Sequence, residues 1–149
     1  MKPKKSLVLV GTIVLLLFAF AGLARAAEPV NQILVNYADI LKANPMPAGD
    51  KAQAIKVADD ETATLFLTKF ASGGEVKAHF HKTHSETLYI IEGSGQMAVD
   101  GKVLEFQPGS IIHIPPTKVH SVKITGNTDL IALQVFAPQW KDPDRVFVP

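Results

Sequence analysis

Most of this chain consists of short apolar runs separated by turn-forming residues. From Thr62 onward the runs are rich in Val, Ile, Leu, Phe and Thr, and Gly, Pro, Asn and Asp stand between them. Side chains in a strand alternate between two faces, and many short strands with closely spaced turns are typical of a sandwich or a closed barrel. We therefore expect an all-β domain. The predicted strands cover 62–70, 76–80, 87–92, 96–99, 102–106, 110–114, 119–124 and 130–136.

A helical pattern precedes the strands. Between residues 28 and 42 the apolar positions recur at helical spacing, which predicts a short helix capped by Asn31 and ended by Pro45. A loosely held N-terminal arm is the alternative. We expect the helix and a linker over 27–50, the barrel over 51–137, and an irregular tail with three prolines over 138–149. The apolar stripe of the helix consists of Ile33, Leu34, Tyr37, Ile40 and Leu41.

The first 26 residues have the layout of a secretory signal peptide. Three lysines lie within the first five residues, residues 7–23 are almost entirely apolar, and Ala24-Arg25-Ala26 is a small-x-small cleavage site. The alternative is an uncleaved membrane anchor, because the apolar run is close to membrane-spanning length. We expect cleavage after Ala26 and a periplasmic or secreted protein, for which the membrane is a partner only through this segment before cleavage.

Composition narrows the function classes. The chain has 149 residues, enough for one domain with a hydrophobic core, and its net charge of +1 does not predict nucleic-acid binding. It has no cysteine, which excludes disulfides, thiolate metal sites and cysteine nucleophiles. No serine has the strand–turn–helix context of a hydrolase nucleophile.

Three histidines and one glutamate have the spacing of a metal site. His79 and His81 are two positions apart, so in a strand both side chains point to the same face. Glu86 follows at the next predicted strand, and His120 lies in a later one. Imidazole nitrogen and carboxylate oxygen bind first-row divalent metals, so we expect these four residues to ligate one ion.

The same residues resemble the two motifs of the cupin superfamily. The first motif, G(X)5HXH(X)3-4E(X)6G, is matched by Gly73, His79, His81, Glu86 and Gly93. The second motif, G(X)5PXG(X)2H(X)3N, is matched at Gly109, Pro115 and His120, whereas Thr117 stands in place of its second glycine and Ile124 in place of its asparagine. The resemblance covers roughly residues 60 to 137.

This resemblance implies a fold and a set of functions. The fold is the cupin jelly roll, a double-stranded β-helix barrel, and small cupins of this kind commonly form homodimers. The cofactor is one divalent transition metal ion, either Fe, Mn, Ni, Cu or Zn. The function we expect is that of an exported, quercetinase-like dioxygenase acting on a small organic molecule. The alternatives are a non-catalytic cupin that binds a sugar or an organic acid, or a cupin isomerase or oxalate-type enzyme.

Other residues complete the sequence prediction. Glu86 is the candidate for proton transfer, because no separate general base is evident in the motifs. His84 is expected at the rim or surface, His113 is left open between cavity and exterior, and Trp140 is expected to anchor the tail by packing. Tyr89 and Phe80 are predicted to lie off the ligand face. The apolar face predicted beside the metal consists of Phe66, Leu88, Ile90, Val122, Ile124, Leu133 and Val135.

Overall fold

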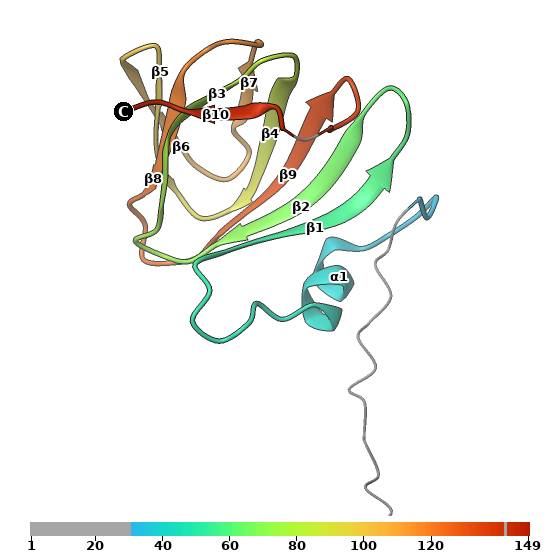
Figure 1. Ribbon diagram of the computed structural model, residues 1–149. Helices are drawn as coiled ribbons and strands as arrows, with labels where there is room; N and C mark the ends of the chain where they lie inside the picture. The colour runs from blue at the N-terminus through green and yellow to red at the C-terminus, as the bar shows by residue number, and fades with distance from the viewer. Residues whose placement is uncertain (1–30, 142) are drawn as a thin grey trace, which may run out of the picture.

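The computed structural model describes residues 31–141 and 143–149, which form two antiparallel β-sheets facing one another (Figure 1). The first sheet has the strand order β1-β2-β9-β4-β7, and the second has the order β10-β3-β8-β5-β6. The predicted signal segment lies outside the described residues, and no helix among those described is long and apolar enough to span a membrane. The elements are α1 (Tyr37–Ala43), β1 (Ala52–Asp59), β2 (Thr64–Phe70), β3 (Glu75–His81), β4 (Ser85–Glu92), β5 (Gly95–Val99), β6 (Lys102–Phe106), β7 (Ile111–Ile114), β8 (His120–Ile124), β9 (Leu130–Ala137) and β10 (Arg145–Phe147).

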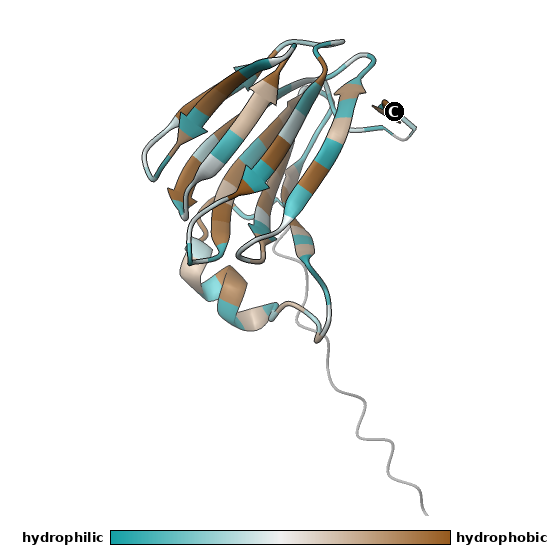
Figure 2. Cartoon of the chain, turned by 90° about the vertical axis from the view of Figure 1, so that its left-hand side faces the viewer, coloured by the Kyte–Doolittle hydropathy of each residue, from teal (hydrophilic) through white to brown (hydrophobic). Residues whose placement is uncertain are grey.

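This all-β jelly roll with one short helix confirms the predicted fold class. The eight strands expected from the sequence are all present, and their ends lie within two residues of the predicted ones. Apolar and polar residues alternate along many of them (Figure 2), which is the signal from which they were predicted. The hairpin turn between β5 and β6 also has the expected conformation, with φ of 46° at Asp100 and 81° at Gly101.

Two buried clusters hold the structure together. The first lies between the sheets, where Leu88 and Ile90 of β4 meet Met97, Phe106 and Ile124 of the opposite sheet. The second lies on the outer side of the first sheet, where Ile40 of α1 packs with residues of β1, β2 and β9. Strands of the first sheet are therefore covered on both faces. The second cluster consists of Ile40, Ile55, Val57, Leu67 and Ile131.

The helix is shorter than the sequence predicts. Its N-cap is Asn36, whose side chain accepts a hydrogen bond from the Ala38 backbone N–H at 2.9 Å. Asn31, the predicted cap, has φ 59° and exchanges hydrogen bonds with the Asp59 backbone at 2.8 and 3.2 Å. Because Asn31 pairs with the end of β1, the chain cannot begin a helix there.

Two strands are not among those that the sequence predicts. β1 pairs with β2 over its whole length at the edge of the first sheet. β10 pairs with β3 at the edge of the second sheet, so the tail over 138–149 is not irregular throughout as expected. β10 is three residues long, too short for a recognisable alternation of polar and apolar residues. Its pairing depends on the exposed edge of β3.

Two turns show what the motif glycines do. Gly93 has φ 82°, and a Cβ atom there would lie 2.6 Å from the Asp129 carbonyl oxygen, so both conformation and space require glycine. Thr117 also has a positive φ, 69°, at the position where the second motif has glycine. Its backbone N–H donates to the His81 carbonyl at 2.7 Å. The turn thus keeps the motif conformation with a β-branched residue, at a cost in backbone strain.

We expect Thr117→Gly to stabilise the protein. Glycine removes the backbone strain of a β-branched residue in the left-handed region, which stabilises the folded state by about 1–3 kcal/mol. It also raises the conformational entropy of the unfolded chain, which lowers stability by about 0.4–1 kcal/mol. The net increase in the free energy of unfolding should be about 1 kcal/mol, measured by denaturant titration. Thr125→Gly is the matched control, because Thr125 is also exposed and its N–H also binds a carbonyl, but its φ is not positive. A loss of stability in both variants would show that the positive φ of Thr117 does not destabilise the folded state.

Candidate metal centre

The four residues with metal-site spacing come from both sheets and meet between them. His79 and His81 lie on the inner face of β3, and His120 begins β8, directly opposite His79 in the ladder. Glu86 comes from β4 in the other sheet, on the same face as Leu88 and Ile90. Directly paired residues share a face, which explains why the ring centroids of His79 and His120 are only 4.2 Å apart.

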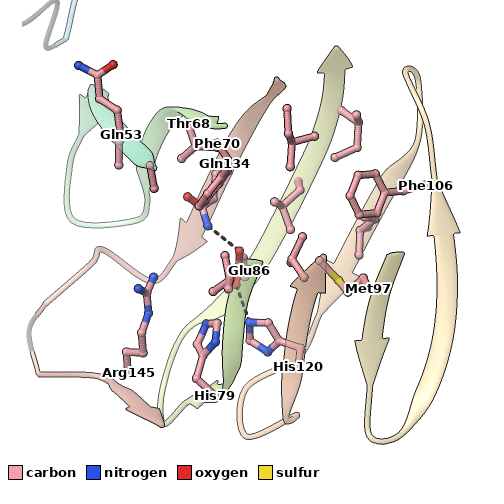
Figure 3. Close-up of a pocket in the computed structure, with 18 residues that line it drawn as sticks. Gln53, Thr68, Phe70, His79, Glu86, Met97, Phe106, His120, Gln134 and Arg145 are labelled. Atoms are coloured by element: carbon pink, nitrogen blue, oxygen red, sulfur yellow. Dashed lines mark hydrogen bonds and ion pairs between the residues drawn. The ribbon is translucent and has the colours of Figure 1, made fainter. Parts of the chain in front are cut away.

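The four side chains form one compact, buried cluster that could hold a metal ion. Each offers one ligand atom, and these atoms all lie within 4.8 Å of one another. None of the four residues is more than 5% exposed. Oε2 of Glu86 lies 3.0 Å from Nε2 of His120 (Figure 3) and 3.3 Å from Nε2 of His81, so the carboxylate sits between two imidazoles.

Backbone carbonyls orient two of the imidazoles. Nδ1 of His79 lies 2.8 Å from the Lys77 carbonyl oxygen, and Nδ1 of His120 lies 2.9 Å from that of Lys118. A carbonyl only accepts hydrogen bonds, so each Nδ1 carries a proton and donates it. This fixes the ring and leaves Nε2 available as a ligand atom, as is usual for metal-binding histidines.

Burial and the neighbouring charges shift the pKa values within the cluster. Burial of His79 lowers its pKa to about 4 despite the opposing hydrogen bond to Lys77, so its ring is neutral at pH 7. Burial alone would raise the pKa of Glu86, but the adjacent imidazoles of His120 and His81 and the hydrogen bond from Gln134 outweigh it and hold the pKa far below its usual range. For His120, burial lowers the pKa, yet the adjacent Glu86 carboxylate more than compensates and raises it. The cluster therefore contains an ionised carboxylate beside imidazoles.

His81 provides the sharpest test of whether a metal fits. Both of its ring nitrogens are buried without a hydrogen-bond partner of good geometry among the described residues. A buried polar atom left unpaired costs about 1–3 kcal/mol. A cation beside Nε2 would satisfy that atom, and the remaining donors, two imidazoles and a carboxylate, are those that divalent transition metals prefer. The residues present therefore fit one such ion.

A second carboxylate, Asp144, lies behind His81. Its Oδ2 is 3.3 Å from Nδ1 of His81, so this ring stands between Asp144 on one side and Glu86 on the other. Oδ1 of Asp144 accepts hydrogen bonds from the backbone and hydroxyl of Thr83 at 2.9 and 2.7 Å. Burial would raise the pKa of Asp144, but hydrogen bonds from His84 and Thr83 lower it to about 2. A carboxylate in this position can orient a metal-binding imidazole.

His84 is not at the surface as predicted. It is 2% exposed, its Nδ1 lies 2.6 Å from Oδ2 of Asp144, and its Nε2 donates to the Gln139 carbonyl at 2.7 Å. Its ring stacks on Trp140, with centroids 5.3 Å apart. Trp140 also contacts His81 and Phe136, as expected of a packing anchor. The sequence missed this arrangement because Asp144 and Gln139 reach His84 from the distant C-terminal segment.

The remaining histidine, His113, is on the outside. It is exposed on β7, opposite Thr87, and its Nδ1 lies 2.9 Å from the Thr87 hydroxyl. Tyr89 is 46% exposed on the same sheet, and Phe80 alternates with the two β3 histidines, which confirms that both lie off the ligand face. Neither His84 nor His113 belongs to the four-residue cluster.

The cluster opens on one side into a cavity of about 190 Å³ (Figure 3). Leu88, Ile90 and Val122 line it as predicted, and Ile124 packs in the core next to them. Phe66 instead packs edge-to-face against Phe136, with centroids 6.0 Å apart. The lining is mostly apolar, and besides the cluster its polar residues are Gln53, Thr68, Gln134 and Arg145.

The prediction for β9 was wrong by one residue. Gln134, not Leu133 or Val135, points inward, and its Nε2 donates to Oε1 of Glu86 at 2.5 Å. Leu133 lines an apolar groove on the outer side together with residues of α1. Because β9 is apolar on both faces, its sequence shows no alternation that could set the register. A single polar residue in an apolar strand was the available signal.

The fold and the four-residue cluster define a double-stranded β-helix barrel with a potential metal site, and comparison with known proteins agrees. A model of the cupin domain matches residues 66–136. The chain is 32% identical over 79 residues to quercetin 2,3-dioxygenase of Bacillus subtilis (strain 168). This match covers 51% of this chain but only 23% of that protein. It is 35% identical over 81 residues to an oxalate-binding protein of Thermotoga maritima, covering 54% of this chain and 67% of the relative.

A solved structure supports the fold independently. An uncharacterised conserved protein with a double-stranded β-helix domain from Klebsiella pneumoniae superimposes with a TM-score of 0.67 over 79% of this chain and 98% of that one, at 18% identity. This chain belongs to the cupin superfamily.

Proposed function

We propose that this protein is a metal-dependent dioxygenase that acts on a small organic substrate, with an activity related to that of quercetin 2,3-dioxygenase. The observation that carries this proposal is the position of the cluster relative to the cavity. His79, Glu86 and His120 all line the cavity, so a substrate inside it would contact an ion bound by these residues. The match to the dioxygenase covers 51% of this chain and only 23% of that enzyme.

The chemistry of the donor set supports the proposal. A divalent metal held by His79, His81, Glu86 and His120 would supply Lewis-acid and redox chemistry toward dioxygen and a chelating substrate. Three nitrogens and one oxygen suit Fe, Mn, Ni, Cu or Zn. Availability of the ion, more than affinity, decides among them.

The surrounding residues prepare the cavity for such a reaction. Its aliphatic walls exclude bulk water, which strengthens electrostatic interactions inside. Glu86 faces the cavity and is the candidate proton acceptor for a bound substrate. The contacts with His120 and Gln134 that lower its pKa make it a weak base, so they must loosen before it takes a proton. Gln134 holds Oε1 of Glu86 and thereby orients the carboxylate. Glu86 is the proposed catalytic residue, and Gln134 acts through it as a positioning residue.

A non-catalytic binding protein is the second candidate. One observation favours it: the relative of which this chain covers 67% is an oxalate-binding protein, a name that states binding and no turnover. The same cavity and cluster would then bind a small ligand without transforming it. Oxygen consumption distinguishes the two candidates.

Metal binding can be measured on variants of purified protein by elemental analysis and chelator competition. His81→Ala should lose most of the bound metal because a ligand is removed. Asp144→Asn should keep the site but bind metal about 10–100-fold more weakly, as expected for loss of a carboxylate that orients a ligand. His113→Ala is the control, since His113 is exposed on the outer face. Equal metal content in His81→Ala and His113→Ala would refute the assignment.

Catalysis can be measured as oxygen uptake by Fe(II)- or Mn(II)-loaded protein with flavonols and diketones. We expect Glu86→Gln to lower kcat by at least about 100-fold, with a smaller change in KM, because it removes a proton acceptor. Glu92→Gln, an exposed glutamate on the same strand, should retain wild-type kinetics. If the wild-type protein takes up no oxygen but binds a small ligand tightly, the function is that of a non-catalytic binding protein and not of a dioxygenase.

We also propose that the mature protein forms a homodimer. Tyr89 and Ile111 are paired across β4 and β7, and they are 46% and 73% exposed on the outer face. Burial of such side chains against a second copy would remove apolar area from water. Sedimentation velocity of the wild type should show a dimer that Ile111→Asp shifts toward monomer; a wild-type monomer at micromolar concentration would argue against it.

A further inference from the structure

One cationic side chain reaches the cavity, and it comes from the C-terminal strand. Among the described residues that line the cavity, Arg145 is the only lysine or arginine. In the β10–β3 ladder Arg145 is directly opposite His81, and Phe147 is opposite His79. Directly opposed residues share a face, so Arg145 is on the inner face with the histidines, and Figure 3 shows its side chain near His79.

The structure holds the backbone of Arg145 firmly and leaves its charge available. The backbone carbonyl of Asp144 accepts from the Lys82 N–H at 3.2 Å, and the Val148 N–H donates to the Ala78 carbonyl at 3.0 Å, so both ends of β10 are fixed. The guanidinium lies 5.8 Å from the centre of the Trp140 ring, a cation–π contact that restricts its position. Within the described residues, no carboxylate is within ion-pair distance of Arg145.

Arg145 lines the same cavity as His79 and His120, which belong to the proposed metal centre. Arg145 is exposed, whereas the cluster is buried, so it marks the side of the cavity that is open to solvent. A ligand entering from this side meets the guanidinium first and the cluster next.

The remaining walls restrict what the ligand can be. Beyond the cluster they are mostly apolar, formed by Leu88, Ile90, Met97, Phe106 and Leu130 among others, with Gln53 and Thr68 as polar exceptions. A guanidinium matches the two oxygens of a carboxylate or a phosphate with paired hydrogen bonds. A carboxylate on an apolar body offers one group to the guanidinium and apolar surface to these walls.

We propose that the ligand of this cavity is a small carboxylic acid with an apolar body, and that Arg145 binds its carboxylate while the aliphatic walls hold the body. This inference rests on the proposed function for the location of the ligand beside the cluster. It does not depend on dioxygenase activity, because a binding protein would use the same contact. It makes Arg145 a residue that determines specificity for acids over neutral analogues.

The test compares acids with their amides by isothermal titration calorimetry on the full-length protein. The probes are benzoate and hexanoate, with benzamide and hexanamide as neutral analogues of nearly the same shape. The wild type should bind at least one acid at least 10-fold more tightly than its amide. Arg145→Met should weaken binding of that acid about 10–100-fold and leave binding of the amide within twofold, whereas Arg145→Lys should be intermediate. Lys141→Met, an exposed cation of the same segment that does not line the cavity, should bind like wild type.

Two results would overturn the proposal. The first is a wild-type protein that prefers neither acid over its amide. The second is an Arg145→Met variant that loses acid and amide affinity equally, which would mean a structural role. Metal content and oxygen uptake are measured on the same samples. Loss of acid preference with normal metal content disproves only this inference, and acid preference without oxygen uptake disproves only the dioxygenase.

Discussion

The structure depends on one buried anion, the carboxylate of Glu86, held between the two sheets. Glu86 stands on β4, and its partners His81 and His120 stand on β3 and β8 of the opposite sheet. A charge buried without partners would cost several kcal/mol, so the sheets must bring imidazoles to it. This requirement fixes where the sheets meet at this end of the barrel. The aliphatic cluster of Leu88, Ile90 and their neighbours fills the space beyond.

The C-terminal segment adds further contacts to the histidines around this anion. Asp144 reaches His81 and His84, the Gln139 carbonyl accepts from His84, and Trp140 packs against both rings. Gln139 also donates to Asp59 at the end of β1, so the first strand of the barrel is tied to the same network. The C-terminal segment therefore encloses one side of the site, and its strand β10 places Arg145 at the cavity.

This arrangement suggests how a widespread fold acquires an individual site. The ligand spacing, the glycine turn at Gly93 and the left-handed turn at Thr117 set the position of the cluster within the barrel. The polarity of the cavity is set elsewhere, by Gln134 on β9 and Arg145 on β10. Specificity in such a protein can then change through residues of β9 and β10 while the buried cluster stays as it is.

The eight main strands, the Asp100-Gly101 hairpin turn and the four residues of the cluster could be predicted from the sequence. These features are local: alternation, turn residues, and a two-residue spacing that puts His79 and His81 on one face. The tertiary structure alone decided the rest. The inward position of Gln134 follows from its pairing with Leu88 in the β4–β9 ladder, and Asn31 caps no helix because it pairs with β1. Asp144, His84 and Arg145 gain their roles through contacts between segments about 60 residues apart, and no local pattern encodes such contacts.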